Sequence, residues 1–326
     1  MKYLSLFSGI GGFELGIQQA YETTRNTNVQ KVGGRQENEE GELQENGERL
    51  HSISSKTTLP IRDRDNEHAD RSFDERQPNC IGFSEIDKYA TKVYKHHYPK
   101  HKEYGDITSI NEKTLPDFDL LVGGFPCQSF SIAGKRGGFD DTRGTLFFDI
   151  ARIVREKQPR LLLLENVKGL LSHDQGRTFT TIISTLDELG YDCQWQVLNS
   201  KNHGVPQNRE RVFIIGNLRG TSRPEVFPFG ESDRLPTESG REGETKGGIA
   251  STITKNYHKG VHSGGETYAL SEDSEIRRLT PLETERLQGF PDNWTKVCDT
   301  SDSQRYKMCG NAVTVNVIQD IISKVI

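Results

Sequence analysis

Two residues with chemically useful side chains, Cys127 and Glu165, closely follow short apolar runs of the sequence. The run 120–124 predicts a buried strand that ends in a glycine break before Pro126 and Cys127. A thiol placed there lies beside unpaired backbone N–H groups, which favour the nucleophilic thiolate. The alternative is a structural cysteine, because most free cysteines lie in protein cores. The residues themselves leave both interpretations open.

Glu165 directly follows the uninterrupted apolar run 161–164, which is typical of a strand covered on both faces. A carboxylate in that position is costly unless it is paired or used, so Glu165 is the second catalytic candidate. Arg209 and Arg211 precede another apolar run, and their spacing predicts that they share one face of a strand. Surface ion pairing is the alternative to a role in chemistry for both arginines.

A glycine-rich turn at residues 8–12 stands between a predicted strand at 3–7 and a helical pattern that continues through Tyr21. Such a turn lets the backbone approach a ligand closely, and the start of the helix offers free N–H groups. The spacing differs from the dinucleotide fingerprint. A nucleoside-like cofactor and a merely tight turn therefore both remain open.

Acidic residues follow the next predicted elements. The strand 80–83 ends before Glu85, which is placed to accept hydrogen bonds from a ribose. Asp87, two residues later, is explained equally well as the cap of the helix predicted from Lys88 to His97. Asp106 is interpreted as a further acid at the end of a strand.

The remaining elements alternate in the same way, with helices predicted at 145–157 and 177–189 and strands at 193–198 and 212–215. This order predicts an α/β fold, a doubly wound and mostly parallel sheet. The composition shifts to Gly, Ser, Thr, Glu and Pro after residue 217, which predicts a smaller, irregular, β-containing domain. We expect a large domain at 1–217 plus 303–326 and the smaller one, with a hinge helix starting at Arg277, at 218–302.

Residues 24–79 are polar and lack either hydrophobic period, which predicts a flexible insertion far from the strand ends that carry the chemistry. This stretch carries a net charge of −3 out of −5, so total charge neither supports nor excludes a nucleic-acid partner. Five cysteines without paired spacing indicate a reducing compartment. We expect no metal, because no Cys or carboxylate spacing completes a site around His96, His97 and His101. No run approaches membrane-spanning length.

In chain order, these segments resemble the bacterial and phage DNA (cytosine-5)-methyltransferases. The resemblance covers residues 2–22 and about 79–326. Its blocks are LFSGIGG at 6–12, SEIDKYA at 84–90, GDIT at 105–108, GFPCQSFS at 124–131, RGTLFFD at 143–149, ENV at 165–167, QNRERVF at 207–213, RLTPLETERLQGFP at 278–291 and GNAV at 310–313.

The resemblance implies a Rossmann-like domain that binds S-adenosylmethionine and releases S-adenosylhomocysteine. Glu85 is expected to hold the ribose hydroxyls, Ile86 to pack against the adenine, and Asp106 with Ile107 to read its edge. The other positions that match the family's donor pocket are Phe7, Gly9, Gly11, Pro126, Leu146 and Asn311.

The resemblance also implies the chemistry. Carbon 5 of cytosine is a poor nucleophile, so the Cys127 thiolate adds to carbon 6 while Glu165 hydrogen-bonds or protonates ring N3. Arg209 is expected to hold the base or its backbone, with Arg211 in support. A stacked base offers no approach to carbon 6, so the base must rotate out of the duplex, and the basic, glycine-rich loop 129–138 is expected to act as a lid.

The smaller domain is expected to read duplex DNA in the major groove. The expected contacts are Ser131, Lys135, Arg136, Thr252, Thr254, Lys255, Tyr257 and His258. We expect a cytoplasmic protein that acts as a monomer on DNA, in a restriction-modification system or as a phage protective enzyme, without physical need of a restriction endonuclease. An RNA cytosine methyltransferase of the same fold and a DNA-binding protein with a vestigial donor pocket are the alternatives.

Overall fold

The computed structural model describes residues 1–36, 77–126, 146–230, 249–257, 268–270, 276–297 and 299–326. Contacts divide the chain into two units, Met1–Ala20 with Pro78–Ile326, and Tyr21–Gln77. The first unit contains every described residue that the sequence assigns to chemistry.

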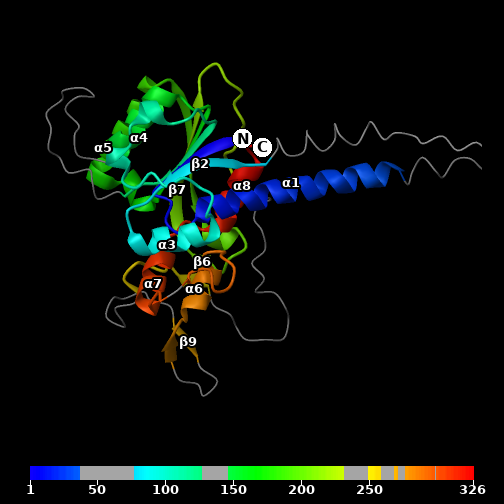
Figure 1. The fold of residues 1–326 in the computed structure, drawn as a ribbon, viewed down its shortest axis with the longest axis vertical. Helices are drawn as coiled ribbons and strands as arrows, with labels where there is room; N and C mark the ends of the chain where they lie inside the picture. The colour runs from blue at the N-terminus through cyan, green and yellow to red at the C-terminus, as the bar shows by residue number, and fades with distance from the viewer. Residues whose placement is uncertain (37–76, 127–145, 231–248, 258–267, 271–275, 298) are drawn as a thin grey trace, which may run out of the picture. The chain divides into compact units, whose positions relative to one another are not determined.

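A six-stranded sheet forms the centre of the first unit (Figure 1). Its spatial order is β2-β1-β3-β4-β7-β5. Strands β2, β1, β3 and β4 pair in parallel, and β7 is antiparallel to both β4 and β5. The predicted α/β class with a mostly parallel sheet is therefore confirmed. The strand bounds are β1 Lys2–Leu6, β2 Asn79–Ser84, β3 Leu120–Gly124, β4 Leu161–Val167, β5 Tyr191–Asn199 and β7 Glu210–Leu218.

Helices pack against this sheet because alternate strand residues point to opposite faces. Leu4 and Leu6 of β1 enter the hydrophobic cluster that includes buried residues of α4 and α5, which Figure 1 shows on one side of the sheet. On α1, a Cβ added to Gly16 would meet the side chain of Ile318 on α8, so these two helices are in close contact. The helix bounds are α1 Gly12–Gln36, α3 Lys88–His97, α4 Leu146–Lys157, α5 Arg177–Glu188, α6 Pro281–Leu287, α7 Asp302–Asn311 and α8 Val315–Ser323.

Short strands occupy the region predicted as the smaller domain. They are β8 (Ala250–Ser251), which pairs with β6 (Gln207–Asn208), and β9 (Tyr268–Leu270), which pairs with β10 (Ile276–Arg278). A small hydrophobic cluster supports them, with buried members Ala250, Ile253, Tyr257, Leu279 and Leu287.

Several predicted boundaries were wrong for identifiable reasons. Helix α1 continues to Gln36, so residues 24–36 are helical although they lack an apolar period. Arg277 belongs to strand β10, and the helix begins only at Pro281, because Thr280 forms a capping box with Glu283. Asp106 follows no strand; it caps the short 3-10 turn η1 (Ile107–Ser109).

No helix in the described ranges combines the length and the apolarity needed to cross a membrane. In the same ranges, no group of His, Cys, Asp and Glu side chains is arranged to hold a metal ion. His97 stacks on Trp294 with ring centroids 3.6 Å apart, and His101 Nδ1 lies 3.0 Å from the Tyr94 hydroxyl. These histidines are thus engaged in packing and hydrogen bonding.

Candidate active site at the carboxyl edge of the sheet

The carboxyl ends of β1, β2, β3 and β4 meet at one edge of the sheet, where open α/β folds carry their ligands. The glycine turn after β1, Glu85 after β2, Pro126 after β3 and Glu165 near the end of β4 are brought to this edge. Cys127, Ser131, Lys135, Arg136 and His258 lie outside the described residues.

The turn after β1 has a backbone that requires glycine. Gly9 and Gly11 adopt positive φ values of 55° and 88°, and Phe7 between strand and turn has φ 53°. A Cβ added to Gly11 would lie 2.6 Å from Cε2 of Tyr98. The Ser8 N–H donates to the Ser84 carbonyl over 3.1 Å, which joins this turn to the end of β2.

Glu85 is fixed by backbone donors from two strand ends. Its Oε2 accepts the N–H of Gly9, and its Oε1 accepts the N–H groups of Ile86 and Asp87, each over 2.8 Å. Asp87 instead caps α3 by accepting the N–H of Tyr89 over 2.9 Å, as expected for the capping alternative. The Glu85 carboxylate thus has a fixed position, and three of its about four lone-pair sites are used by these N–H groups.

Apolar and polar groups around Glu85 differ in exposure. Ile86 is 74 % exposed, which leaves an apolar side chain open to solvent beside the carboxylate. Asp106 is exposed, and its Oδ1 accepts the Thr108 N–H over 2.9 Å. Ile107 is buried in the main core, so only its backbone can contact a ligand. Of the other expected pocket residues, Pro126 and Asn311 are exposed and Leu146 is half-buried.

The end of the chain returns to this edge through specific contacts. Lys307 Nζ on α7 lies 2.6 Å from Asp87 Oδ2. The Trp294 indole N–H donates to the Ile10 carbonyl over 2.8 Å, and a Cβ added to Gly12 would lie 2.8 Å from Cγ1 of Val313. These contacts hold the segment that ends in Asn311 near the turn after β1.

Glu165 forms an ion pair with Arg211, whose Nε lies 3.0 Å from Glu165 Oε1. Both side chains are mostly buried, with exposures of 13 % and 16 %. Glu165 is the partner of Gly124 in the β3–β4 register, and a Cβ added to Gly124 would lie 3.0 Å from Glu165 Oε2. The carboxylate therefore lies over the end of β3, two residues before Pro126.

Asn166, which sequence reasoning did not single out, anchors the chain that leads to Cys127. It is buried, its Nδ2 donates to the Phe125 carbonyl over 2.8 Å, and its Oδ1 accepts the Val167 N–H over 2.8 Å. The signal was present, since an amide side chain directly after Glu165 at the end of a buried strand must find partners.

Arg209 was expected to hold the base, but its side chain is directed into the protein. Its guanidinium is buried and donates to the carbonyls of Ile253, Gly310 and Ala312 over 3.0, 3.2 and 2.8 Å. Burial lowers the pKa of Arg209 to about 9, and the nearby charge of Arg211 acts in the same direction. Because its terminal nitrogens bind main-chain carbonyls, it is not free to hold a base. It also lies in the break between β6 and β7, not on one continuous strand with Arg211.

Among the residues expected to contact DNA, some are exposed and others are engaged within the protein. Thr252 donates its hydroxyl to the Asn208 carbonyl over 2.7 Å, while Thr254 and Lys255 are exposed. Tyr257 is buried, and its hydroxyl accepts the Leu279 N–H over 2.9 Å. The expectation that Tyr257 contacts DNA is therefore corrected, because its side chain belongs to the small hydrophobic cluster.

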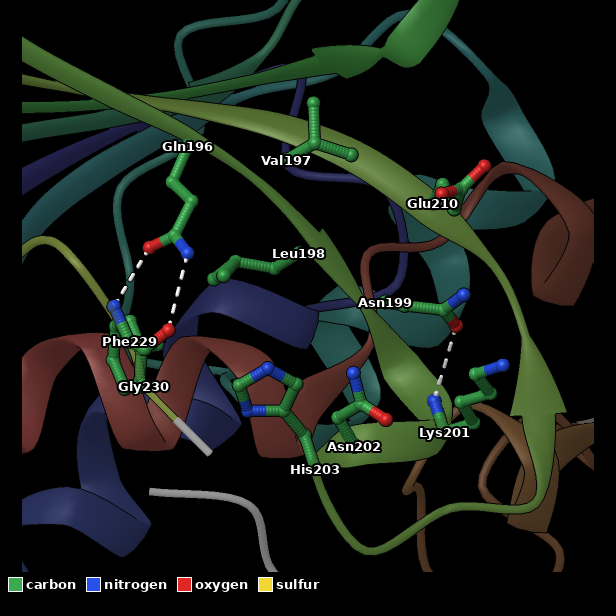
Figure 2. A pocket seen from close by; sticks show the side chains of 10 residues that line it. All are labelled: Gln196, Val197, Leu198, Asn199, Lys201, Asn202, His203, Glu210, Phe229 and Gly230. Carbon is green, nitrogen blue, oxygen red and sulfur yellow. Dashed lines mark hydrogen bonds between the residues drawn. The ribbon is translucent and has the colours of Figure 1, made fainter. Parts of the chain in front are cut away.

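A cavity of about 380 Å³ lies beside the end of β5, and its lining includes Asn199 and Glu210 (Figure 2). Gln196 closes one side through paired hydrogen bonds with the backbone of Phe229, over 2.8 and 3.2 Å. His203, at another side, pairs with Asp320 over 2.6 Å. None of the residues expected to bind the donor or the base lines this cavity, so we do not place the chemistry there.

Comparison with known proteins identifies what the chain is similar to. The family model described as C-5 cytosine-specific DNA methylase matches residues 69–240 and 225–326. Type II methyltransferase M1.ScrFI of Lactococcus lactis subsp. cremoris is 42 % identical over 281 residues, which cover 74 % of this chain and 71 % of the relative. Type II methyltransferase M.HhaI of Haemophilus parahaemolyticus is 39 % identical over 286 residues, covering 74 % and 86 %.

Two further similarities extend over nearly the whole chain. Type II methyltransferase M.NlaX of Neisseria lactamica is 33 % identical over 354 residues, covering 98 % of this chain and 94 % of the relative. The crystal structure of a Spodoptera frugiperda DNMT2 mutant has a TM-score of 0.63 at 18 % identity, covering 99 % and 98 %. At that identity the structural likeness supports the fold alone.

Proposed function

This chain belongs to the C-5 cytosine-specific DNA methylase family and is a DNA (cytosine-5)-methyltransferase, and we propose that it acts through a covalent Cys127 adduct on a base flipped out of duplex DNA. The methyl donor is proposed to be S-adenosylmethionine. The observation that carries the proposal is the Glu165–Arg211 pair, which lies over the end of the strand leading into Pro126 and Cys127.

The edge of the sheet fits the proposed donor. The fixed Glu85 carboxylate keeps an acceptor site for a ribose hydroxyl group, and the exposed Ile86 offers an apolar surface for a purine ring. A Cβ added to Gly9 would meet nothing within 4 Å, so the backbone there permits close approach of a ligand, whereas Gly11 packs against Tyr98. When bound, S-adenosylmethionine supplies an electrophilic methyl group on a sulfonium sulfur.

The protein's own groups then make cytosine a nucleophile. The Cys127 thiolate adds to carbon 6, and the Glu165 carboxyl stabilises the ring at N3, so that electron density reaches carbon 5 as an enamine. After methylation, loss of the carbon 5 proton expels the thiolate. We assign Arg211, and not Arg209, to hold Glu165 and the base, since it is the arginine within 3.0 Å of that carboxylate.

Asn166 is proposed to fix the position from which the Cys127 thiolate approaches the base. Its hydrogen bond to the Phe125 carbonyl holds the main chain two residues before Cys127. A stacked base cannot reach groups at the edge of a sheet, so the target cytosine is proposed to leave the stack. Glu165, Arg211 and Asn166 are proposed to form one side of the pocket that the cytosine would enter.

The smaller domain, proposed at 218–302, would read the DNA sequence, and 1–217 with 303–326 would carry the chemistry. Thr254 and Lys255, which are exposed, are proposed to contact DNA. We propose that one copy acts on duplex DNA and that the product protects sites in a restriction-modification or phage context, with no nuclease needed for methylation.

Bisulfite sequencing of DNA from cells that express the protein tests this function. The expected result is complete methylation of one cytosine in one short sequence, absent when the cells express Cys127→Ala at the same level. Methylation by Cys127→Ala would contradict the covalent mechanism, and the absence of methylation by the wild type would contradict the function.

A further inference from the structure

Arg209 joins three segments that are distant in the sequence. Its side chain reaches the carbonyl of Ile253, which precedes the exposed Thr254 and Lys255, and the carbonyls of Gly310 and Ala312 at the end of α7. Its Nε–H is also buried and has no hydrogen-bond partner among the described residues. A planar guanidinium can bind several carbonyls at once in a fixed arrangement.

The main chain of Arg209 is held on the opposite side, by the large sheet. Its N–H donates to Asn199 Oδ1 over 3.1 Å, and its carbonyl accepts the Ser200 N–H over 3.1 Å. Both partners lie at the end of β5, which pairs with β7 along its whole length. The backbone of Arg209 is therefore hydrogen-bonded to the end of β5 in the large sheet, and its guanidinium is hydrogen-bonded to the segment 250–255, which we call the recognition segment.

Neighbouring contacts hold the recognition segment in register with Arg209. Strand β8 pairs with β6, Gln207 Oε1 accepts the Ile253 N–H over 2.9 Å, and Thr252 donates to the Asn208 carbonyl. A Cβ added to Gly310 would lie 2.5 Å from the Thr254 carbonyl oxygen and closer still to its carbonyl carbon. The end of α7 thus contacts the recognition segment without space for one more carbon atom.

Two residues beyond Arg209, Arg211 makes the ion pair with Glu165. The three residues 209–211 therefore connect the recognition segment to the catalytic pair through one short piece of chain. If DNA displaces the recognition segment, Arg209 should move with it, because packed elements shift as units. The start of β7, which follows Arg209 directly, should then shift as well.

We propose that Arg209 is a positioning residue that couples the recognition segment to the Glu165–Arg211 pair, so that engagement of the correct DNA sequence sets the rate of methyl transfer. The inference rests on the proposed function and extends it by stating how recognition acts on catalysis. It assigns Arg209 no contact with the base.

Two variants separate the coupling from the catalytic groups. Arg209→Lys keeps the charge but loses the planar fork. Gly310→Ala leaves Arg209 intact and forces the recognition segment away from α7, since the clash is with backbone. Single-turnover methylation would be measured on a duplex with the site found by bisulfite sequencing and on a duplex with one base pair of that site replaced.

We expect the rate constant on the correct site to fall about 10²-fold, as for a small misplacement of reacting groups. The ratio of rate constants between the two duplexes should fall about tenfold, a typical coupling between sites. The amplitude, which reports the folded and active fraction, and the affinity for S-adenosylhomocysteine should stay close to those of the wild type. Loss of folded protein would lower the amplitude and leave the rate constant unchanged.

Arg305→Lys is the matched control. Arg305 is also buried and donates to Glu285 over 3.0 Å, which joins α7 to α6, and its second ion-pair partner is Asp302 on α7 itself. The Arg305→Lys variant should be less stable than the wild type, while the ratio of rate constants between the two duplexes stays at the wild-type value. An unchanged ratio in both Arg209→Lys and Gly310→Ala, with active wild type, would overturn the coupling alone. A wild type that methylates no cytosine would overturn the proposed function and the coupling with it.

Discussion

The Glu165 carboxylate lies 3.0 Å from Arg211 Nε across the pairing of β4 with β7. Glu165 is opposite Phe213 and Val167 is opposite Arg211, so the charged residues are diagonal neighbours on one face of the sheet. Both are mostly buried, which strengthens their mutual attraction relative to a pair in water.

Glu165→Gln should lower the single-turnover rate of methylation by about 10²-fold or more, a usual loss for an acid–base group. The amide keeps the size of the side chain but cannot exchange a proton with ring N3. Glu210→Gln is the control, because Glu210 is exposed at the start of the neighbouring strand β7 and pairs with Lys168. Equal rates for Glu165→Gln and the wild type would exclude Glu165 from the chemistry.

Glu85→Gln should weaken binding of S-adenosylmethionine about tenfold, the effect of about 1.4 kcal/mol from a lost charged hydrogen bond. The amide nitrogen cannot accept a backbone N–H, so either the Gly9 bond or the bonds from Ile86 and Asp87 would be lost. Titration calorimetry measures the change. Asp87→Asn, which alters the helix cap and leaves Glu85 in place, should change donor affinity much less.

Gly11→Ala should destabilise the protein more than Gly220→Ala, although both glycines have φ near +85°. An alanine in this conformation costs about 1 kcal/mol or more at either position. At Gly11 the new Cβ also meets Tyr98, whereas nothing lies within 4 Å at Gly220. Thermal unfolding gives the difference, and equal losses of stability would contradict the close packing of the turn against Tyr98, which caps the end of α3.

Glu14 should make stability fall as the pH rises from about 4.5 to about 7. Burial raises the pKa of Glu14 to about 7, although the hydrogen bond from the Tyr94 hydroxyl acts in the opposite direction. Between these two pH values the folded state holds a proton that the unfolded state has released. The free energy of unfolding is therefore highest below the unfolded-state pKa, and it falls as the pH rises through the folded-state pKa, by up to about 1.4 kcal/mol per pH unit. Glu14→Gln should remove this dependence in urea unfolding between pH 5 and pH 8. An identical pH profile for the two proteins would show that Glu14 ionises normally.

Sequence patterns were sufficient to predict a residue's position where that position depends on the strand or helix beside it in the sequence. Glu165 at the end of an apolar run and Asp87 before a helix both occupy the positions that their neighbours predict. The roles of Arg209 and Tyr257 could not be predicted, because their partners lie 22 to 103 residues away. The helical stretch 24–36 was missed because it has no apolar face, and periodicity was the signal used.

The three described free cysteines are poor nucleophiles. Burial raises the pKa of Cys80, Cys193 and Cys309 to about 12 in each case, with charge from Glu14 adding to the effect at Cys80. These thiols stay protonated at neutral pH, so a covalent adduct with a base is not expected at any of them.

The most direct measurement of the central claim is therefore a covalent trapping experiment. A duplex that carries 5-fluorocytosine at the target position is incubated with the protein and S-adenosylmethionine, because fluorine cannot leave as the carbon 5 proton does. We expect a complex that survives denaturation, with peptide mapping by mass spectrometry placing the attached base on Cys127. No stable complex, or attachment at another cysteine, would contradict the account.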